Sequence, residues 1–225
     1  MKPSRPAIRL LWGATIFLAL IGLAAVTRRV VVLIPTLRTG YQPPATAFDS
    51  GFARHPILTM VHILPGALFM ILGPLQFVPR IRSRFPKFHR WSGRVFLILG
   101  VVIGISALMM SFQATIGGAN ETAATTLFAL IFLFSLGKAY VHIRRREFAR
   151  HREWMIRAFA IGLAVATIRP IVGIFFALSR LTHQSPHEFF GTAFWLGFTI
   201  QLLVAEIWIN VTRPQLTKFR ETPAR

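Results

Sequence analysis

Three histidines and one arginine lie where they could do chemistry within an apolar chain. His89 and His151 each open a basic-aromatic cluster, His89-Arg90-Trp91 and His151-Arg152-Glu153-Trp154, that follows a run of arginines and precedes a long apolar stretch. His62 and Arg169 lie inside apolar stretches. Imidazole nitrogens ligate haem iron, and guanidinium groups pair with carboxylates. These four residues are therefore the candidates for binding a cofactor or an anionic group.

The apolar stretches predict membrane-spanning helices. Of the 225 residues 54% are hydrophobic, and the mean hydropathy is +0.57, which is too apolar for an ordinary soluble domain. A helix of about 20 apolar residues crosses the bilayer core. Six such blocks occur, at residues 10–34, 57–79, 95–113, 122–143, 155–179 and 189–211. We expect an all-α integral membrane helical bundle, with a single membrane domain over residues 1–225.

The net charge of +19 is concentrated in a few connecting segments. If the N-terminus is cytoplasmic, 19 of the 26 Lys and Arg residues lie on the cytoplasmic side, as the positive-inside rule requires. We expect a multi-pass protein of the bacterial inner membrane with both termini cytoplasmic, whose basic connections attract anionic lipid headgroups. Nucleic-acid binding is not favoured, because no nucleic-acid-binding motif accompanies the charge. The absence of cysteine excludes thiolate metal sites and iron–sulfur clusters.

The first apolar block resembles a secretory signal peptide but is longer than one. Its apolar run from Ile8 to Val26 exceeds the usual signal-peptide core of about 7–15 residues. We interpret it as a retained first helix, interrupted near the outer surface by Arg28 and Arg29, whose long side chains could reach the headgroups. Cleavage would leave five helices and is the alternative.

The two basic-aromatic clusters indicate two helical hairpins of the same orientation. The second and third blocks form one hairpin, the fourth and fifth form the other, and each turns through a basic connection. A duplicated hairpin would give an antiparallel four-helix core, with the first and sixth helices flanking it. The similarity is confined to the turns, so chance similarity stays an alternative.

Helical spacing places the polar and small residues of three blocks on single faces. These faces carry His62, Gly66, Phe69, Gly73 and Gln76 in the second block, His89, Gly93, Gly100, Gly104, Ala107 and Ser111 in the third, and His151, Ala158, Gly162, Val165 and Arg169 in the fifth. Small residues permit close helix packing in lipid, or leave room for a flat ligand such as a macrocycle or quinone. Polar residues on these faces should point into the bundle.

Arg169 requires a partner, because a charge at its depth costs about 2.5–3.5 kcal/mol on insertion scales. Glu206 is the one acidic residue deep in a block, and its depth predicts an ion pair with Arg157. Arg169 is then left for an anionic ligand. Alternatively, it caps carbonyl groups freed by the following Pro170.

The histidines permit one haem site. His89 and His151 begin parallel helices at equal depth and could hold haem b between them, with nearby arginines for its propionates. His62 has no histidine partner on the fourth block. The alternative is that both clusters are interfacial anchors, with Trp in the aromatic belt. A metal site at His183 and His187 is a weaker possibility, because a helix start lies between them, and no hydrolase motif is present.

The ordered motifs over residues 55 to 180 resemble a family of bacterial membrane proteins of the domain-of-unknown-function class, DUF2306. They are His62 with Gly66, Gly73-Pro74-Leu75-Gln76-Phe77, His89-Arg90-Trp91-x-Gly93-Arg94, His151-x-x-Trp154-Met155-Ile156-Arg157, and Arg169. The resemblance implies a membrane-embedded fold and no particular activity. The chain is more loosely similar to transmembrane di-haem cytochromes of the ascorbate-dependent ferric reductase type, from which it departs by lacking a partner for His62.

Two functions from different classes follow. The first is electron transfer with haem or a quinone, using His89 and His151 as ligands and Arg169 beside an anionic group. The second is a non-enzymatic small-solute carrier or assembly partner, in which the histidines are interfacial anchors. A carrier predicts a water-accessible cavity that reaches Arg169 and His62. The sequence does not identify a substrate or redox partner, and whether the protein is an enzyme stays open.

Overall fold

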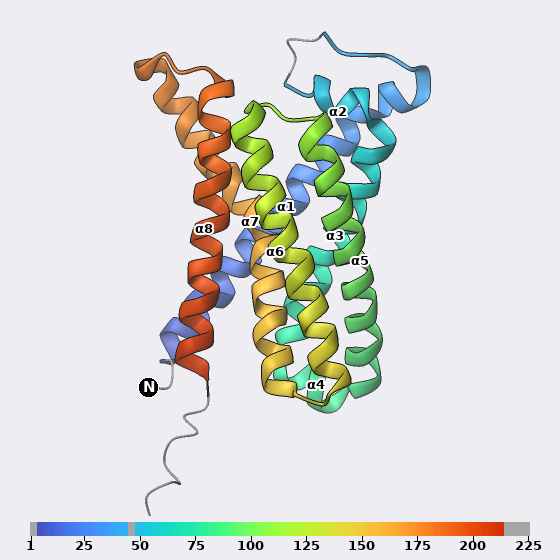
Figure 1. The fold of residues 1–225 in the computed structure, drawn as a ribbon, viewed down its shortest axis with the longest axis vertical. Helices are drawn as coiled ribbons and strands as arrows, with labels where there is room; N and C mark the ends of the chain where they lie inside the picture. The colour runs from blue at the N-terminus through green and yellow to red at the C-terminus, as the bar shows by residue number, and fades with distance from the viewer. Residues whose placement is uncertain (1–3, 45–47, 214–225) are drawn as a thin grey trace, which may run out of the picture.

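The computed structural model describes residues 4–44 and 48–213, and the fold of these residues is entirely helical (Figure 1). Six helices are long and apolar enough to cross a membrane, which confirms the predicted fold class. They are α1 (Arg5–Thr39), α3 (Pro56–Phe77), α5 (Pro86–Gln113), α6 (Gly118–Arg144), α7 (Phe148–Thr182) and α8 (Pro186–Thr212). Two short helices, α2 (Ser50–Arg54) and α4 (Pro79–Arg84), lie in the connections.

Two of the helices, α5 and α7, begin well before the apolar blocks that predicted them. We expected spans from residues 95 and 155, but α5 begins at Pro86 and α7 at Phe148. Hydropathy marks the part of a helix that lies in hydrocarbon, whereas the backbone hydrogen bonds continue through Lys and Arg, which are good helix formers. His89 and His151 are therefore each the fourth residue of a helix rather than residues of a loop.

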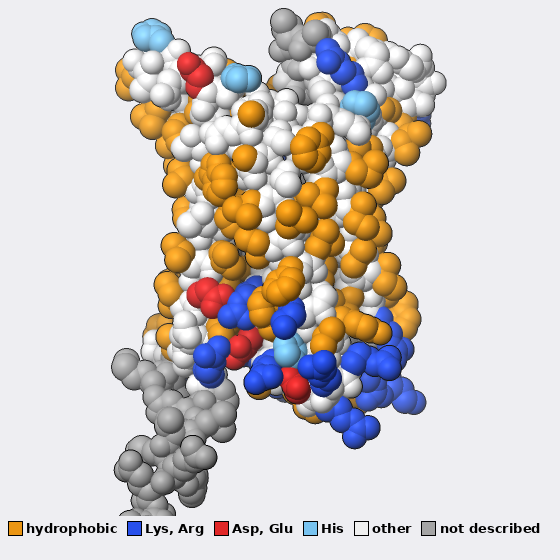
Figure 2. All heavy atoms as spheres, viewed as in Figure 1, with side chains coloured by type: hydrophobic (Ala, Val, Ile, Leu, Met, Phe, Trp, Pro, Cys, Tyr) orange, Lys and Arg blue, Asp and Glu red, His pale blue; other side chains and the backbone are white. Residues whose placement is uncertain are grey.

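The arginine-rich connections gather at one end of the bundle. The start of α1, the helix α4, the turn between α6 and α7 and the end of α8 lie together at this end (Figure 1). Figure 2 shows most of the visible Lys and Arg side chains there. We call it the basic end and the opposite one the distal end. Of the basic residues counted above, Lys2, Lys218, Arg220 and Arg225 lie outside the described residues.

The predicted four-helix core is formed by α3, α5, α6 and α7. Each hairpin, α3 with α5 and α6 with α7, packs tightly, α5 packs on α6, and α3 contacts α7. This places α5 and α7 diagonally across the core. The flanking helices are those expected, with α1 on α3 and α7, and α8 on α6 and α7. Whether the hairpins arose by duplication stays a prediction.

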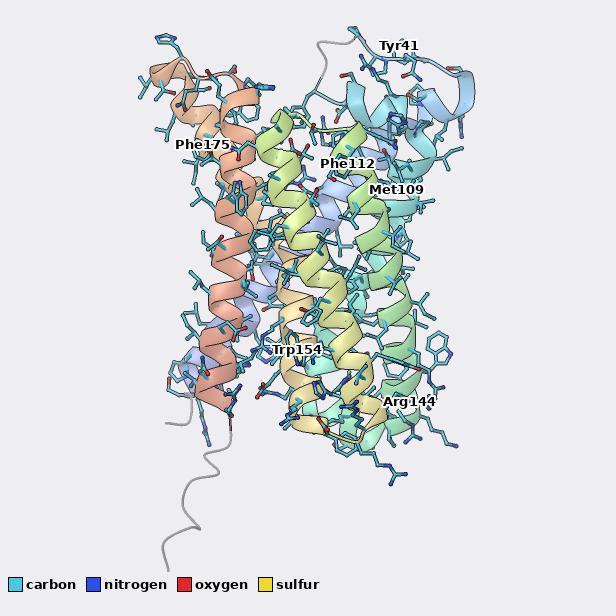
Figure 3. All side chains as sticks on the ribbon, in the orientation of Figure 1. Tyr41, Met109, Phe112, Arg144, Trp154 and Phe175 are labelled. Carbon is cyan, nitrogen blue, oxygen red and sulfur yellow. The ribbon has the colours of Figure 1, made fainter. Side chains whose placement is uncertain are left out.

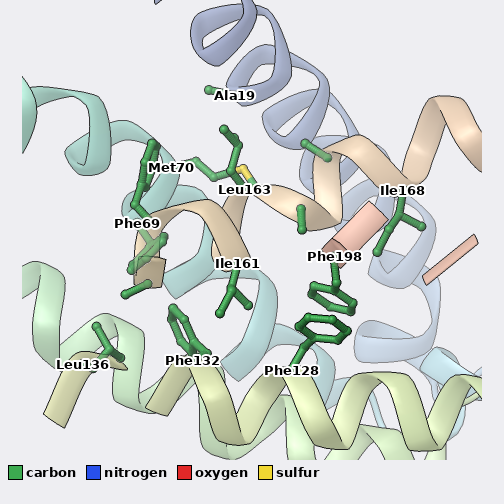
Figure 4. Close-up of a cluster of buried hydrophobic side chains, with 14 of the residues drawn as sticks. Ala19, Phe69, Met70, Phe128, Phe132, Leu136, Ile161, Leu163, Ile168 and Phe198 are labelled. Atoms are coloured by element: carbon green, nitrogen blue, oxygen red, sulfur yellow. The ribbon is translucent and has the colours of Figure 1, made fainter. Parts of the chain in front are cut away.

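Aromatic side chains fill the middle of the core. Phe69 stacks on Phe96 with ring centroids 4.0 Å apart, and the rings of Phe132 and Phe159 lie 5.7 and 6.2 Å from Phe69. Figure 4 shows Phe69 and Phe132 among the other buried apolar side chains. The four rings come from the four core helices, so they close the bundle between its two ends.

Glycines on the predicted faces allow this close packing. A Cβ atom at Gly73 would lie 2.1 Å from a ring carbon of Phe159, and one at Gly100 would lie 2.7 Å from Leu136. In lipid, helices associate mainly through such close contacts, because the hydrophobic effect between them is absent. Helix packing therefore accounts for these two glycines.

The helix ends are defined by local hydrogen bonds. The predicted start of α8 is confirmed, since the Ser185 backbone N–H donates to Glu188 Oε2 at 2.6 Å in a capping box. In the turn between α6 and α7, Glu147 Oε2 lies 2.7 Å from His142 Nδ1 and accepts from Arg150 at 3.2 Å. The hydrogen bond with His142 is the main cause that lowers the pKa of Glu147 from its ordinary value.

Adding one methyl group at Gly73 should destabilise the bundle. Because three ring atoms of Phe159 lie within 3.0 Å of the position of the new Cβ, Gly73→Ala is expected to cost about 1–3 kcal/mol through overpacking. The matched control is Gly173→Ala on α7, where a Cβ meets nothing within 4 Å. Thermal unfolding in detergent should give a lower melting temperature for Gly73→Ala alone. Equal stability of the two variants would contradict the packing.

Candidate functional sites

The four candidate residues divide between two cavities. His89 and His151 line a cavity in the basic half of the bundle, which we call the basic-end cavity. His62 and Arg169 line a second one, the distal cavity. Phe69, which lines the distal cavity, belongs to the ring cluster that closes the middle of the core. The four residues therefore belong to two separate sites.

The basic-end cavity lies mainly between α5 and α6 and has a volume of about 890 Å³. That volume falls within the range of small-molecule and cofactor sites. Its walls are mostly apolar, with a few polar groups. Its lining comprises Gln76, His89, Arg90, Gly93, Arg94, Leu97, Ile98, Val101, Val102, Leu133, Leu136, Gly137, Tyr140, Ile143, Arg144, His151 and Met155. Because α5 and α7 are diagonal in the core, the two histidines reach this cavity from non-adjacent helices.

The ring of His151 is oriented by the backbone of α6. Its Nδ1 lies 2.8 Å from the carbonyl oxygen of Ala139. A carbonyl can only accept, so Nδ1 carries the hydrogen and, in the neutral ring, Nε2 carries the lone pair. This is the arrangement that orients metal-ligating histidines, whose second nitrogen donates to a carbonyl or carboxylate.

His89 has an unpaired polar atom in the interior. Its Nδ1 is buried and is the one such side-chain nitrogen or oxygen among the described residues without a hydrogen-bond partner. The polar groups beside it are engaged with one another, since Gln76 Nε2 donates to Ser92 Oγ at 2.8 Å. An unpaired buried polar group is costly, and such groups in native proteins point to a missing ligand or water.

Three arginines surround the part of the basic-end cavity nearest the end of the bundle. Arg90, Arg94 and Arg144 line it and are exposed. Figure 3 shows Arg144 at the basic end of α6. Ile98 and Val101 line the same cavity and are also exposed on the apolar surface of α5, so the cavity is open toward the side of the bundle. This arrangement suits a molecule with an apolar body and an anionic end.

The two basic-aromatic clusters differ in their aromatic residue. Trp91 is 62% exposed, as expected for an interfacial anchor. Trp154 is partly buried, meets Phe134 edge to face, and has the Arg157 guanidinium 4.6 Å from its ring centroid. The anchor hypothesis therefore accounts for Trp91 but not for Trp154, nor for the position of either histidine beside the cavity.

The distal cavity has a volume of about 190 Å³ and receives side chains from all six spans. Its lining comprises Gly22, Ala25, Val26, Arg29, Phe52, His62, Ile63, Gly66, Phe69, Met70, Ile103, Ala107, Met110, Ser111, Ala114, Thr115, Glu121, Thr125, Gly162, Val165, Arg169, Phe194 and Phe198. His62 Nδ1 lies 3.0 Å from Ser106 Oγ, which fixes the ring against α5.

Arg28 and Arg29, whose side chains we expected to be able to reach the headgroups, also have a protein partner. Both bind Asp49, and Arg28 does so through two nitrogens at 3.2 and 2.9 Å. Arg29 is 6% exposed, and its guanidinium carbon lies 3.8 Å from the centroid of the Phe52 ring. Asp49 lies in the polar connection between α1 and α3. The fold of this connection places its carboxylate beside the two arginines.

Arg169 has no protein partner among the described residues. No hydrogen bond or ion pair joins it to any of them, although Asp49 and Glu121 act on it electrostatically. Glu121 Oε2 instead accepts from the backbone N–H groups of Ile116 and Gly117, at 2.8 and 2.6 Å. We considered that Arg169 could instead bond to backbone carbonyls freed by Pro170. No such hydrogen bond occurs among residues 4–44 and 48–213.

Arg157 and Glu206 form the predicted ion pair. Arg157 Nε and Nη2 donate to the two carboxylate oxygens of Glu206 at 2.5 and 2.9 Å. Among the described residues no three His, Cys, Asp or Glu side chains gather as metal ligands. His187, the weaker metal candidate, lies against Gly118 instead.

Several site residues were missed by sequence reasoning. The Ala139 carbonyl and Ser106 orient the two buried histidines, and neither residue type signals this role. Glu121 carried a signal, because an acidic residue in the first turn after Gly117-Gly118 is placed to bind free amides. Asp49 carried one too, as an acidic residue in the connection that follows Arg28 and Arg29.

The fold and its polar interior define a polytopic α-helical membrane protein. The sequence matches a family of predicted membrane proteins, DUF2306, over residues 59–209. The chain therefore belongs to this family, and the match extends beyond the residues that carried the resemblance. No curated protein and no solved structure matches the chain.

Removing the acid that Arg28 and Arg29 share should destabilise the distal end. Asp49→Asn leaves the buried Arg29 without its counter-charge, and loss of one partner of a buried pair costs about 3 kcal/mol or more. The matched control is Glu153→Gln, whose partner Arg213 is 52% exposed, with an expected cost below about 1 kcal/mol. Thermal unfolding of both variants in detergent measures the difference, and comparable losses would show that the Asp49 cluster is not structural.

Proposed function

We propose that the protein is a membrane electron-transfer protein that holds haem b in the basic-end cavity, with His89 and His151 as axial ligands. The observation that carries the proposal is the presence of both histidines, from diagonal helices, in one largely apolar cavity. Both are the fourth residue of their helix, so they enter the bundle at matching positions.

The residues present fit the chemistry of haem. The hydrogen bond from His151 Nδ1 to Ala139 leaves Nε2 as the ligating atom. The buried, unpaired Nδ1 of His89 favours a ligand at this position. Apolar walls suit the macrocycle, and Arg90, Arg94 and Arg144 suit its propionates. Haem, when bound, supplies reversible one-electron oxidation and reduction.

The chain's own residues would set the properties of the site. The Ala139 carbonyl orients His151 and raises its basicity as a ligand. The apolar walls from α5 and α6 limit access of water, and the arginines favour the more negative charge state of whatever they surround. The lateral opening beside Ile98 and Val101 allows entry from the lipid phase.

A small-solute carrier is the second candidate, favoured by the distal cavity, which reaches both His62 and Arg169 as a carrier requires. The cluster of four phenylalanine rings lies between this cavity and the basic half of the core. Transport would therefore require this aromatic cluster to open.

Absorption spectra of the purified protein test the haem proposal. Protein made in haem-supplied cells should show a Soret band that shifts on dithionite reduction. His151→Ala should bind haem at least about tenfold more weakly in a haem titration, since a lost ligand bond exceeds about 1.4 kcal/mol. Gly137→Leu should also lose haem, because a Cβ at Gly137 meets nothing within 4 Å and the side chain would fill the cavity without a clash.

Two variants serve as controls for these spectra. His62→Ala and Gly173→Leu lie outside the basic-end cavity and should keep their haem. A wild-type protein without a Soret band would contradict the proposal, and recovery of a quinone by organic extraction would identify the other redox ligand. Haem that persists in both His89→Ala and His151→Ala would place it elsewhere.

We also propose that the basic end faces the cytoplasm, as the charge asymmetry favours. The chain contains no cysteine, so single cysteines report on each side. A cysteine at Arg145, exposed in the α6–α7 turn, should resist a membrane-impermeant maleimide in intact cells. One at the exposed His183 of the α7–α8 connection should react. The reverse labelling pattern would show that the basic end faces outward. Labelling after lysis is the control that both cysteines can react.

A further inference from the structure

The distal cavity contains a guanidinium group without a direct counter-ion. Arg29, which lines the cavity, is paired with Asp49, while Arg28, which shares Asp49, has a 57% exposed side chain and lies outside the lining. The carboxylate of Glu121, the negative group in the wall, is bound to two backbone amides. Arg169 is therefore the lining cation whose hydrogen-bond donors have no partner in the described residues.

The remainder of the cavity wall is mostly apolar. Phe52, Phe194 and Phe198 line it together with Met70 and Met110. Its volume of about 190 Å³ exceeds the roughly 150 Å³ of an apolar cavity known to bind benzene. Such a space accepts a body of about the size of a benzene ring. An apolar pocket with one unpaired guanidinium is the complement of a small organic acid.

We infer that the distal cavity is a binding site for a compact organic monocarboxylate, whose carboxylate pairs with Arg169 while its apolar body lies among the phenylalanines. A monoanion matches the single unpaired guanidinium, whereas a doubly charged phosphate would bring one negative charge more than Arg169 can pair. His62, fixed against Ser106 in the same wall, is a polar neighbour for the bound acid. This site is separate from the basic-end cavity and does not depend on haem.

Benzoate is a suitable probe, because it joins a carboxylate to a benzene-sized body. The full-length protein in lipid nanodiscs should bind benzoate saturably at one site by calorimetry, and benzyl alcohol, its uncharged counterpart, should bind at least about tenfold more weakly. Arg169→Gln should weaken benzoate binding by about tenfold to a hundredfold, the range for hydrogen bonds to charged groups. Arg169→Lys keeps the charge but loses the bidentate geometry, so its affinity for benzoate should lie between those of the wild type and Arg169→Gln.

Cavity-filling variants locate the bound probe. Gly66 lines the distal cavity, and a Cβ there meets nothing within 4 Å, so Gly66→Leu should remove benzoate binding without overpacking. The matched control is Gly137→Leu, which fills the basic-end cavity and should leave benzoate binding unchanged. Gly137→Leu is expected to lose haem and to keep benzoate binding, so failure of either site is distinguishable from failure of the other.

Three results would overturn the inference. The first is an absence of saturable benzoate binding by the folded wild-type protein, with folding verified by thermal unfolding. The second is unchanged binding in Arg169→Gln or in Gly66→Leu. The third concerns oleate as a competitor. If oleate displaces benzoate at a concentration below the one at which benzoate itself binds, the occupant is a membrane fatty acid and not a compact acid.

Discussion

Polar groups inside a bilayer must find their partners within the bundle, because hydrocarbon supplies neither hydrogen bonds nor counter-ions. The described polar groups of the spans satisfy this constraint through contacts between helices or through bonds to carbonyls of their own helix. Arg157 binds Glu206, and Arg29 binds Asp49. The Nδ1 of His89 and the guanidinium of Arg169 depart from it, and each belongs to a residue that lines a cavity. The places where the rule fails are therefore the places where ligands are expected.

The aromatic cluster of the core lies in the middle of the bundle, between its basic and distal halves. Phe69, Phe96, Phe132 and Phe159 pack against one another from four different helices. Gly73 permits this by admitting the Phe159 ring against the backbone of α3. A laterally open cavity with two histidines lies on the basic side, and a compact cavity with an unpaired arginine lies on the distal side. This separation is the reason that each proposal has its own variants and its own readout.

The two cavities differ in how many of their lining residues fall within the region that matches the family. The basic-end cavity is built entirely from residues 76 to 155, within the match over residues 59–209. The distal cavity also uses Arg29 of α1 and Phe52 of α2, which precede the match. Relatives that share only the matched region could keep the histidine pair and yet have a different distal wall. The distal wall is accordingly only partly contained in the region that defines the family match.

The sequence alone determined the number of spans, the gathering of basic residues at one end and the Arg157–Glu206 pair, because hydropathy, charge and depth are encoded locally along each helix. It also placed His62, His89, His151 and Arg169 on inward faces. Tertiary structure decided how they group, since His89 shares one cavity with His151 while His62 shares the other with Arg169. It likewise brought Asp49 back to Arg28 and Arg29 and the Ala139 carbonyl to His151. Such pairings depend on the relative positions of different helices, which helical periodicity within one segment does not specify.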